Sequence, residues 1–252
     1  MWQTPTNESL GLADGDVHVW RWSLAASAEE IAARKLVLSP DEVARAERFY
    51  FARHHDAFVA ARAGLRRTLA RYLATPAESI EFLYGHAGKP ELSGRHAGDE
   101  PALNHYHSGD LALCAVARRG PLGIDVEMLR PMNDAAGLAR RYFASAEVKV
   151  WQGLPADEQI PAFFRCWTRK EAYLKALGDG LRAPLDRFVV SLAPGEPPRL
   201  IQPSPHDTAA GWSIEDIDMG KVNVGEGEIG DGYVAALVVP AGFRAAQYLS
   251  GD

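Results

Sequence analysis

Two acidic side chains that lie two residues apart, Asp125 and Glu127, are the first candidates for chemistry in this sequence. They alternate with Ile124 and Val126, and this alternation predicts a strand on which both carboxylates project from the same face. Neighbouring carboxylates repel each other, and a hard divalent cation such as Mg²⁺ commonly keeps both of them ionised. The pair indicates a magnesium site, although an acidic pair exposed on an edge strand would have the same pattern.

A second group of candidate residues follows some forty positions later. Trp167, Glu171 and Lys175 are spaced at i, i+4 and i+8, so a helix would place them along one stripe. One interpretation is an ordinary helical salt bridge between Glu171 and Lys175, with Trp167 as packing. The other makes Glu171 a third metal ligand or a general base, and Lys175 a partner for phosphate oxygens.

Two histidines, His105 and His107, flank Tyr106 at the end of another expected strand, just before the turn Ser108-Gly109-Asp110. They could bind a transition metal, but no third His or Cys has a matching spacing. Histidines at a strand end are more often hydrogen-bonded structural residues. At such a junction, however, exposed amides and an imidazole could also hold a phosphate.

Several well-known site motifs are absent from the sequence. It contains no Walker-type phosphate loop, no dinucleotide-binding glycine fingerprint, no hydrolase nucleophile elbow and no His-Glu-x-x-His zinc motif. The two cysteines, Cys114 and Cys166, are far apart and outside any Cys-x-x-Cys spacing. We therefore expect two buried reduced thiols, not a disulfide or a zinc site.

The composition is that of an ordinary globular protein. The 252 residues are 47% hydrophobic and 24% charged, with a formal net charge of −6. This excludes a disordered or collagen-like chain and argues against a nucleic-acid coat. No apolar run is long enough to span a bilayer, and the N-terminus lacks the features of a signal peptide, so we expect a cytoplasmic protein. The length allows one large domain or two halves.

Charge is unevenly distributed along the chain. The segment 34–71 contains nine basic and four acidic residues, whereas the segment 207–231 contains seven acidic residues and one lysine. A locally basic segment in an acidic protein indicates a site for an anionic ligand or partner. A solvated helix face would have the same composition.

Strands and helices are expected in both halves without strict alternation, which predicts an α+β fold. Capping-box pairs begin at Ser27, Ser39 and Thr75, and Gly178 is placed to end a long helix. The expected helices span 28–37, 40–52, 56–73, 134–143, 146–152 and 158–177, with one turn after Thr75. The expected strands span 16–22, 80–83, 102–106, 111–117, 123–127, 188–192, 212–217 and 233–239. We expect a polar loop at 91–100, a mobile loop at 220–232, and a break between halves at 118–121.

The segment Gly123–Glu127, followed by Trp167–Lys175, resembles the paired signature of the 4′-phosphopantetheinyl transferase superfamily. The resemblance extends through Gly88-Lys89-Pro90, the turn 104–109 and the segment 39–50, and covers roughly residues 16 to 240. In length and in having two halves, the chain resembles the surfactin-synthetase-activating branch. This implies a pseudo-dimer of two similar α+β halves with the active site in the cleft between them. We accordingly expect an N-terminal half, 1–119, with coenzyme A and carrier contacts, and a C-terminal half, 120–252, with the magnesium and catalytic motifs.

The resemblance implies an enzyme that transfers the 4′-phosphopantetheine arm of coenzyme A to a serine of an apo acyl or peptidyl carrier protein. The reaction would depend on Mg²⁺ and release adenosine 3′,5′-bisphosphate. Asp125, Glu127 and Glu171 match the magnesium ligands of the family, and Glu171 also matches its candidate base. Lys175 matches the lysine that steadies the pyrophosphate and the leaving group.

Contacts to coenzyme A are implied in the first half of the chain. Lys89 and His107 match such contacts, the histidine near the 3′-phosphate, and Arg53 is placed like an arginine that grips this phosphate in some relatives. Tyr106 stands where many members have a small residue, usually serine, although backbone amides could still serve there. Near Ser39, lysines of bacterial relatives are replaced by Glu42 and Arg45, so no role is transferred to that region.

Two other functions are compatible with parts of the sequence. A non-catalytic module that binds coenzyme A or a carrier would account for the altered turn at Tyr106, and an unrelated magnesium phosphohydrolase would release phosphate without a carrier. We expect the transferase because the three carboxylates and Lys175 are all present. The expected partners are coenzyme A and a carrier protein, with no nucleic acid and no membrane. A monomer is expected because a pseudo-dimer needs no second chain to complete its site.

Overall fold

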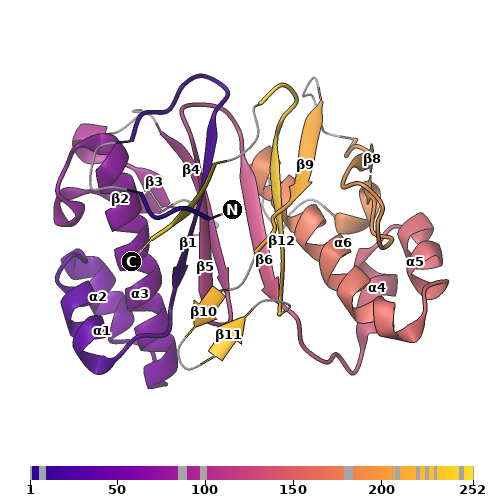
Figure 1. Ribbon diagram of the computed structural model, residues 1–252, viewed down its shortest axis with the longest axis horizontal. Coiled ribbons are helices and arrows are strands. Elements are labelled where there is room, and N and C mark those ends of the chain that lie inside the picture. The colour runs from indigo at the N-terminus through magenta and orange to yellow at the C-terminus, as the bar shows by residue number, and fades with distance from the viewer. Residues whose placement is uncertain are drawn as a thin grey trace. The chain divides into compact units, whose positions relative to one another are not determined.

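The computed structural model describes residues 2–5, 10–84, 90–96, 101–178, 184–205, 207, 211–219, 222–224, 227–229, 232–243 and 247–251. Contacts divide the chain into two compact units, whose elements are labelled in Figure 1. Unit 1 comprises Met1–Arg119, Val222–Glu228 and Ala245–Asp252, and unit 2 comprises Gly120–Lys221 and Ile229–Arg244. The last strand of the chain is therefore part of unit 1, whereas the division expected from the sequence assigns it to the second half.

The sheet of unit 1 has the strand order β13-β1-β5-β4. Its strands are β1 (Val17–Ser23), β4 (Ala102–Ser108), β5 (Leu111–Ala117) and β13 (Gln247–Ser250). Strand β5 pairs antiparallel with both β1 and β4, and β13 lies parallel to β1. All of β5 is buried, as its unbroken apolar sequence requires. The expected tight turn joins β4 to β5, and Gly109 there has a φ of 56°, a conformation that favours glycine.

Three helices accompany this sheet, namely α1 (Ala28–Lys35), α2 (Pro40–Ala46) and α3 (Ala52–Leu73), as Figure 1 shows. The expected capping box forms at α1, where the Ser27 hydroxyl accepts from the Glu30 amide and the Glu30 carboxylate accepts from the Ser27 amide. Trp20 of β1 packs with Leu65 and Leu69 of α3 in the core of the unit. Helix α3 is thereby held against the sheet by apolar burial.

The boundary between the second and third helices differs from the expectation. Helix α2 ends at Ala46 instead of continuing to residue 52, and α3 begins at Ala52 instead of residue 56. Phe51 has an extended backbone between them. The break brings the ring of Phe49 to 5.6 Å from that of Phe58, centroid to centroid. This contact between the connecting segment and α3 is not encoded in the local pattern of either one.

The remaining short elements of unit 1 also differ in detail from the expectation. The capping box expected at Thr75 does not form, because the Thr75 hydroxyl donates to the Leu73 carbonyl and the 3₁₀-helix η1 (Ala77–Ser79) starts after Pro76. Strand β2 (Phe82–Tyr84) pairs with β3 (Pro90–Leu92), and the 3₁₀-helix η2 (Gly94–His96) follows. Strand β3 and η2 thus extend into the stretch where only a polar loop is expected.

Unit 2 contains a three-stranded antiparallel sheet in the order β6-β12-β9. Its strands are β6 (Gly123–Met128), β9 (Trp212–Asp216) and β12 (Tyr233–Pro240). Its helices are α4 (Ala135–Tyr142), α5 (Ser145–Gln152) and α6 (Ala156–Leu177), which Figure 1 shows on the same side of this sheet. Helix α6 packs along β6 and β12 and ends at Gly178, where φ is 77°. These elements agree closely with the expected ranges.

Shorter elements complete unit 2 and the C-terminal part of the chain. They are the 3₁₀-helix η4 (Leu185–Arg187) and the paired strands β7 (Val189–Val190) and β8 (Leu200–Gln202). The strands β10 (Val222–Val224) and β11 (Gly227–Ile229) pair within the segment expected to be a mobile loop. Gly232, the last residue of that segment, accepts a backbone hydrogen bond from Leu129, and residues 220–221, 225–226 and 230–231 lie outside the described residues.

The mixture of helices and largely antiparallel sheets confirms an α+β fold. Within the described ranges, no helix has both the length and the apolar character needed to cross a membrane.

Candidate active site

Strand β6 and helix α6 approach each other unusually closely at Gly123. A Cβ atom on this residue would lie 1.9 Å from the carbonyl oxygen of Ala172 and 2.6 Å from the amide nitrogen of Ala176. Only glycine fits this contact, because both neighbouring atoms belong to the helix backbone. Gly123 therefore positions the strand that carries Asp125 against the helix that carries Glu171. Among the expectations from sequence this glycine has no role of its own, although a glycine in a strand is a recognisable signal of close backbone approach.

The side chain of Lys175 joins the two candidate motifs. Its Nζ donates to Asp125 Oδ1 at 2.5 Å and to the carbonyl oxygen of Ile124 at 3.1 Å. In the described part of the chain no ion pair links Glu171 to Lys175, so the helical salt bridge considered from the i,i+4 spacing is not formed. The lysine instead bridges from α6 to β6, across fifty residues of sequence.

Burial dominates the electrostatics of the two carboxylates. Asp125 is 1% exposed, and its burial raises the pKa of the carboxyl group to about 7, although Lys175 opposes the shift. The negative charges of Glu171 and Glu127 add to that rise. The pKa of Glu171 is also raised, first by burial and then by Glu127, again against the effect of Lys175. Mutual repulsion and desolvation thus make this site unfavourable for several anions without a further cation.

Two buried carboxylate oxygens in this cluster have no hydrogen-bond partner, Asp125 Oδ2 and Glu171 Oε1. Buried polar atoms in folded proteins are nearly always paired, so an unpaired oxygen indicates a place for a ligand or an ion. Among the described residues, however, no group of three or more His, Cys, Asp and Glu side chains is arranged to hold a metal ion. The fit to Mg²⁺ therefore rests on two hard oxygens, which is the number of carboxylates that this ion commonly takes from a protein.

Glu127 is the third carboxylate expected to bind magnesium. It lies on the same strand as Asp125, and its Oε2 accepts from Arg130 Nη1 at 3.2 Å. Arg130 is half-exposed and also donates to the Met128 carbonyl oxygen. The ion pair competes with metal binding for one oxygen of Glu127, and a flexible exposed arginine could release it.

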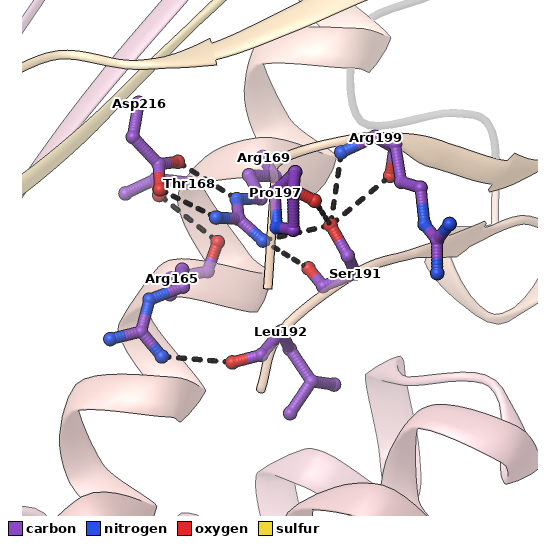
Figure 2. A network of polar contacts seen from close by, with 8 residues as sticks. All are labelled: Arg165, Thr168, Arg169, Ser191, Leu192, Pro197, Arg199 and Asp216. Carbon is purple, nitrogen blue, oxygen red and sulfur yellow. Dashed lines mark hydrogen bonds and ion pairs between the residues drawn. The ribbon is translucent and has the colours of Figure 1, made fainter. Parts of the chain in front are cut away.

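Helix α6 is held in place by a network of polar contacts around Arg169, shown in Figure 2. The guanidinium group of Arg169 donates to both carboxylate oxygens of Asp216, at 2.8 and 2.5 Å, and to the backbone oxygen of Ser191. The Ser191 hydroxyl accepts from the Arg199 amide and donates to the Pro197 carbonyl oxygen. The network ties α6 to the end of β9 and to the segment that follows β7.

Lys170, the next residue along α6, is completely buried. Its Nζ donates to the carbonyl oxygens of Leu185 and Phe188, at 2.7 Å each, and forms an ion pair of 2.8 Å with Glu147. An ammonium group has three donors, so all of them are used here. Arg169 and Lys170 lie inside the family-like motif, but both side chains point into structural contacts and neither received a role from the sequence.

Trp167 is a packing residue. Its indole stacks on Phe163, with 6.0 Å between ring centroids, and meets Tyr142 edge to face at 5.6 Å. Cys166 lies in the same core, and Cys114 lies in the core of unit 1. Both cysteines are free and buried, as expected, and burial raises the pKa of each thiol. These two residues are therefore unsuited to nucleophilic work.

The residues expected to contact coenzyme A belong to unit 1, and those that the structure describes differ in how exposed they are. Arg53 is exposed at the start of α3, where its guanidinium lies 5.3 Å from the centroid of the Phe51 ring. Tyr106 and His107 are adjacent on β4. Tyr106 is half-buried, His107 is exposed, and their ring centroids lie 6.3 Å apart. Lys89 lies outside the described residues. His105 of the same strand pairs in the ladder with Cys114.

Arg62 is a further candidate, for which the sequence pattern indicates no role. It is 6% exposed, its guanidinium lies 5.5 and 5.0 Å from the ring centroids of Phe58 and Tyr84, and its Nη1 has no hydrogen-bond partner. Burial lowers the pKa of this arginine, while nearby Glu42 and Tyr84 oppose that shift. An arginine with unused donors in such a place is suited to binding an anion. In the sequence, Arg62 is one of several arginines in the basic segment 34–71, and nothing distinguishes it from the others.

Glu42 does not neutralise Arg62 directly. Its carboxylate accepts from Arg66 Nε at 2.6 Å, from the Tyr84 hydroxyl at 2.9 Å and from the Ser39 amide at 3.1 Å. The carboxylate is 1% exposed. Glu42 therefore serves the fold of unit 1 through these three donors, in a region where the family resemblance leads one to expect lysines.

Comparison with known proteins places this geometry in a family. The model of the 4′-phosphopantetheinyl transferase superfamily matches residues 121–238, which include β6 and α6. The 4′-phosphopantetheinyl transferase HetI of Nostoc sp. is 41% identical over 210 residues, 83% of this chain and 86% of that protein. A putative 4′-phosphopantetheinyl transferase of Synechocystis sp. is 35% identical over 153 residues, 61% of this chain and 62% of that protein. The 4′-phosphopantetheinyl transferase Sfp of Bacillus subtilis is 30% identical over 158 residues, 62% and 66% of the two chains.

The extent of the similarity to HetI, together with the match that covers the Asp125 and Glu171 motifs, decides the family. The chain therefore belongs to the 4′-phosphopantetheinyl transferase superfamily, and it is an enzyme, a 4′-phosphopantetheinyl transferase.

Proposed function

We propose that this enzyme transfers the 4′-phosphopantetheine arm of coenzyme A to a serine hydroxyl of an apo carrier protein and releases adenosine 3′,5′-bisphosphate. The observation that supports this most directly is the cluster of Asp125, Glu171 and Lys175, in which two buried carboxylate oxygens are left unpaired beside a lysine. Phosphoryl transfer needs this combination, because negative charge must be balanced while a hydroxyl loses its proton.

Glu171 is the proposed base. Its raised pKa keeps it a stronger base than an exposed glutamate, and its unpaired Oε1 is free to accept the serine proton, directly or through a water molecule. As the serine oxygen bonds to the β-phosphorus, the bond from this phosphorus to the oxygen of the departing adenosine bisphosphate breaks. The proton ends on the Glu171 carboxylate, and the electron pair of the broken bond stays on the leaving phosphate.

Lys175 has the proposed role of balancing charge on the phosphates. Its ammonium group is held by Asp125 and by the Ile124 carbonyl, so it is oriented before the substrate binds. A preoriented cation stabilises developing negative charge without having to reorganise.

We further propose that Asp125, Glu127 and Glu171 hold Mg²⁺. The donors are hard oxygens, two of them are unpaired, and the raised pKa values reflect charges that lack a sufficient counter-ion. Bound magnesium would supply a positive charge that is shared by the pyrophosphate oxygens. Glu127 would have to give up its contact with Arg130 to take part fully.

For coenzyme A we propose contacts from Arg53, Lys89, Tyr106 and His107, as the family resemblance implies. Arg62 is added because it is a buried arginine with unused donors, which suits a phosphate group better than the exposed Arg53 does.

The identity of the carrier is a proposal at the level of its class, an acyl or peptidyl carrier protein. The basic segment 34–71 is suited to an acidic partner surface, although some of its arginines serve the fold or coenzyme A. We assign the chain to the surfactin-synthetase-activating branch, which the Sfp similarity supports, although the identity to HetI is higher. A monomeric, cytoplasmic enzyme with an internal pseudo-dimer, and with no contact to nucleic acid or membrane, remains our expectation.

Intact-mass spectrometry tests the reaction. The protein, coenzyme A, Mg²⁺ and a panel of apo acyl and peptidyl carriers are incubated together, and one phosphopantetheine mass should be added to at least one carrier. Removal of Mg²⁺ by a chelator should stop the addition. If no carrier in a broad panel gains this mass, the proposal is wrong.

A matched pair of variants tests the role of Glu171. Glu171→Gln keeps the shape of the side chain and removes the base, so transfer should fall by at least about a hundredfold. Glu158→Gln, in the first turn of the same helix, should transfer at the normal rate. Equal rates for the two variants would remove Glu171 from the reaction.

A further inference from the structure

Three consecutive aromatic side chains are exposed in the segment that connects α2 to α3. The exposed fractions are 40% for Phe49, 92% for Tyr50 and 54% for Phe51. A single exposed apolar residue needs no explanation, whereas contiguous ones commonly mark a binding surface. None of the three belongs to the candidate active site or to the proposed coenzyme A contacts. This aromatic segment, Phe49–Phe51, therefore requires an explanation of its own.

The backbone and the rings of the aromatic segment are held in place. The Phe49 amide donates to the Ala46 carbonyl oxygen at 3.1 Å, and the Phe51 carbonyl oxygen accepts from the His54 amide at 2.9 Å. The rings of Tyr50 and Phe51 meet edge to face, with 4.9 Å between their centroids. Side chains that are already ordered lose little conformational entropy when a partner binds.

The charged groups closest in sequence to the aromatic segment are mainly basic. Arg45 and Arg48 are exposed, and within the described ranges neither side chain forms a hydrogen bond or an ion pair. The acidic residue between them, Glu47, is paired with Lys35, which lowers the pKa of its carboxyl group. Positive charge without a paired acid thus accompanies the exposed rings. This combination suits a partner that carries acidic side chains around an apolar one.

The exposure of the rings favours a protein partner over a small molecule. Small-molecule sites are concave and bury most of the ligand, whereas the almost fully exposed ring of Tyr50 protrudes into solvent. Tyrosine and arginine are enriched among the residues that dominate the energy of protein interfaces. An anionic lipid surface also attracts aromatic and basic side chains, but the proposed reaction requires a protein, the carrier.

We propose that the aromatic segment, together with Arg45 and Arg48, is a docking surface for the carrier protein. An apolar side chain of the carrier would pack on Tyr50 and Phe51, and acidic side chains beside it would pair with the two arginines. The inference rests on the proposed function, because it gives the carrier of that reaction a place to bind. It uses none of the residues proposed for catalysis, magnesium or coenzyme A, so docking and chemistry can be tested separately.

Isothermal titration calorimetry measures docking without chemistry. The full chain is titrated with apo acyl and peptidyl carriers in the absence of coenzyme A. Tyr50→Ser and Arg48→Gln should each weaken the binding of the best carrier about tenfold. The matched controls are Ile201→Ser and Arg140→Gln, which change an exposed apolar residue of β8 and an exposed arginine of α4, and both should bind like the unmodified protein. If no carrier binds, or if the segment variants bind as tightly as their controls, the docking surface is wrong.

Transfer kinetics distinguish a failure of docking from a failure of the proposed function. Tyr50→Ser should raise the KM for the carrier about tenfold and leave the KM for coenzyme A unchanged. A higher KM for coenzyme A alone would assign the segment to the coenzyme and overturn the docking surface. Carrier binding that depends on Tyr50, without phosphopantetheine transfer to any carrier, would support the docking surface and contradict the proposed function.

Sedimentation with vesicles of phosphatidylglycerol and phosphatidylcholine tests the lipid alternative. The full chain should stay in the supernatant. If it sediments with the vesicles and Tyr50→Ser does not, the segment binds membranes and the proposal is overturned.

Discussion

Two groups of buried charges each include one of the neighbouring α6 residues Lys170 and Glu171, and the two groups differ in one respect. Lys170 and Glu147 form a closed set, in which every donor of the ammonium group has an acceptor. Each oxygen of Glu147 also accepts a hydrogen bond from a backbone amide, that of Ala144 or that of Val190. Asp125 and Glu171 form an open set, in which one oxygen of each is buried and unpaired. A buried charge that only supports the fold has all its hydrogen bonds satisfied, as in the closed set. A ligand site keeps some of these atoms unpaired until the ligand binds, as in the open set.

Residues that are adjacent in a sequence motif can therefore have unrelated roles. Arg169, Lys170 and Glu171 follow one another, yet the first two anchor the helix and only the third faces an unfilled place. Adjacent positions on a helix point in different directions, so such a division of labour is possible within one turn. Three substitutions test this difference, and a fourth tests a buried histidine of unit 1.

The largest expected effect is on the open set. Asp125→Asn keeps the side-chain shape but removes the buried charge, so we expect phosphopantetheine transfer to fall about a thousandfold. The free energy of unfolding should change by less than about 1 kcal/mol, because the charge of Asp125 is itself costly to bury. Intact-mass assays and urea unfolding measure the two quantities. If Asp125→Asn transfers at the normal rate, Asp125 has a structural role and takes no part in the reaction.

The closed set should respond in the opposite way. Lys170→Met leaves the Glu147 charge buried without its partner and two carbonyl groups without a donor, so the protein should lose about 3 kcal/mol of unfolding free energy. Urea unfolding measures the loss, and the folded fraction should still carry out transfer. Lys149→Met, on the exposed side of α5, is the control and should change stability by less than about 0.5 kcal/mol. A wild-type midpoint for Lys170→Met would remove the distinction between the sets.

A smaller loss of stability is expected when β6 and α6, which carry the two motifs, are pushed apart. The methyl group of Gly123→Ala would collide with the backbone of α6 at Ala172, so we expect a loss of about 2 kcal/mol in stability, together with slower transfer. Gly153→Ala is a suitable control, because its Cβ would meet nothing closer than 3.4 Å. Equal stability of the two variants would show that α6 and β6 can separate without cost.

The smallest effect concerns a buried imidazole in unit 1. Burial lowers the pKa of His18 below its usual value of 6.5, against the effect of Asp16, and its Nδ1 contacts the Tyr72 hydroxyl at 2.8 Å. The unfolded chain therefore binds a proton more readily than the folded one, so stability is complete above about pH 6.5 and falls as the pH drops through the lower folded pKa. His18→Asn should remove this part of the pH dependence, for which each unit of lowered pKa corresponds to about 1.4 kcal/mol of stability.

Urea unfolding, followed by tryptophan fluorescence between pH 5 and pH 8, measures this pH dependence for the unmodified protein and for His18→Asn. If His18→Asn loses stability with acid as steeply as the unmodified protein does, other groups account for the decline.

Much of the fold was accessible from periodicity and capping. The strands β5, β6 and β12 and the helices α1 and α6 agree with their expected ranges because each has a strong local pattern. The failures occur where distant contacts decide the outcome. Helix α2 stops early at the place where Phe49 packs on Phe58, and β13 joins β1 in a parallel pair from the far end of the chain. Local sequence patterns do not predict contacts between segments that are distant in the chain.

The chemical content of the site follows from residue types and spacing: two carboxylates on one strand, a Glu and a Lys one helical turn apart, and a motif specific enough to indicate the family. Packing had to be seen before it was clear that Lys175 pairs with Asp125 and not with Glu171, that Arg169 and Lys170 are internal anchors, and that Arg62 is buried with unused donors. Residue spacing sets which face of an element a side chain occupies, whereas burial and pairing depend on which other element packs against that face.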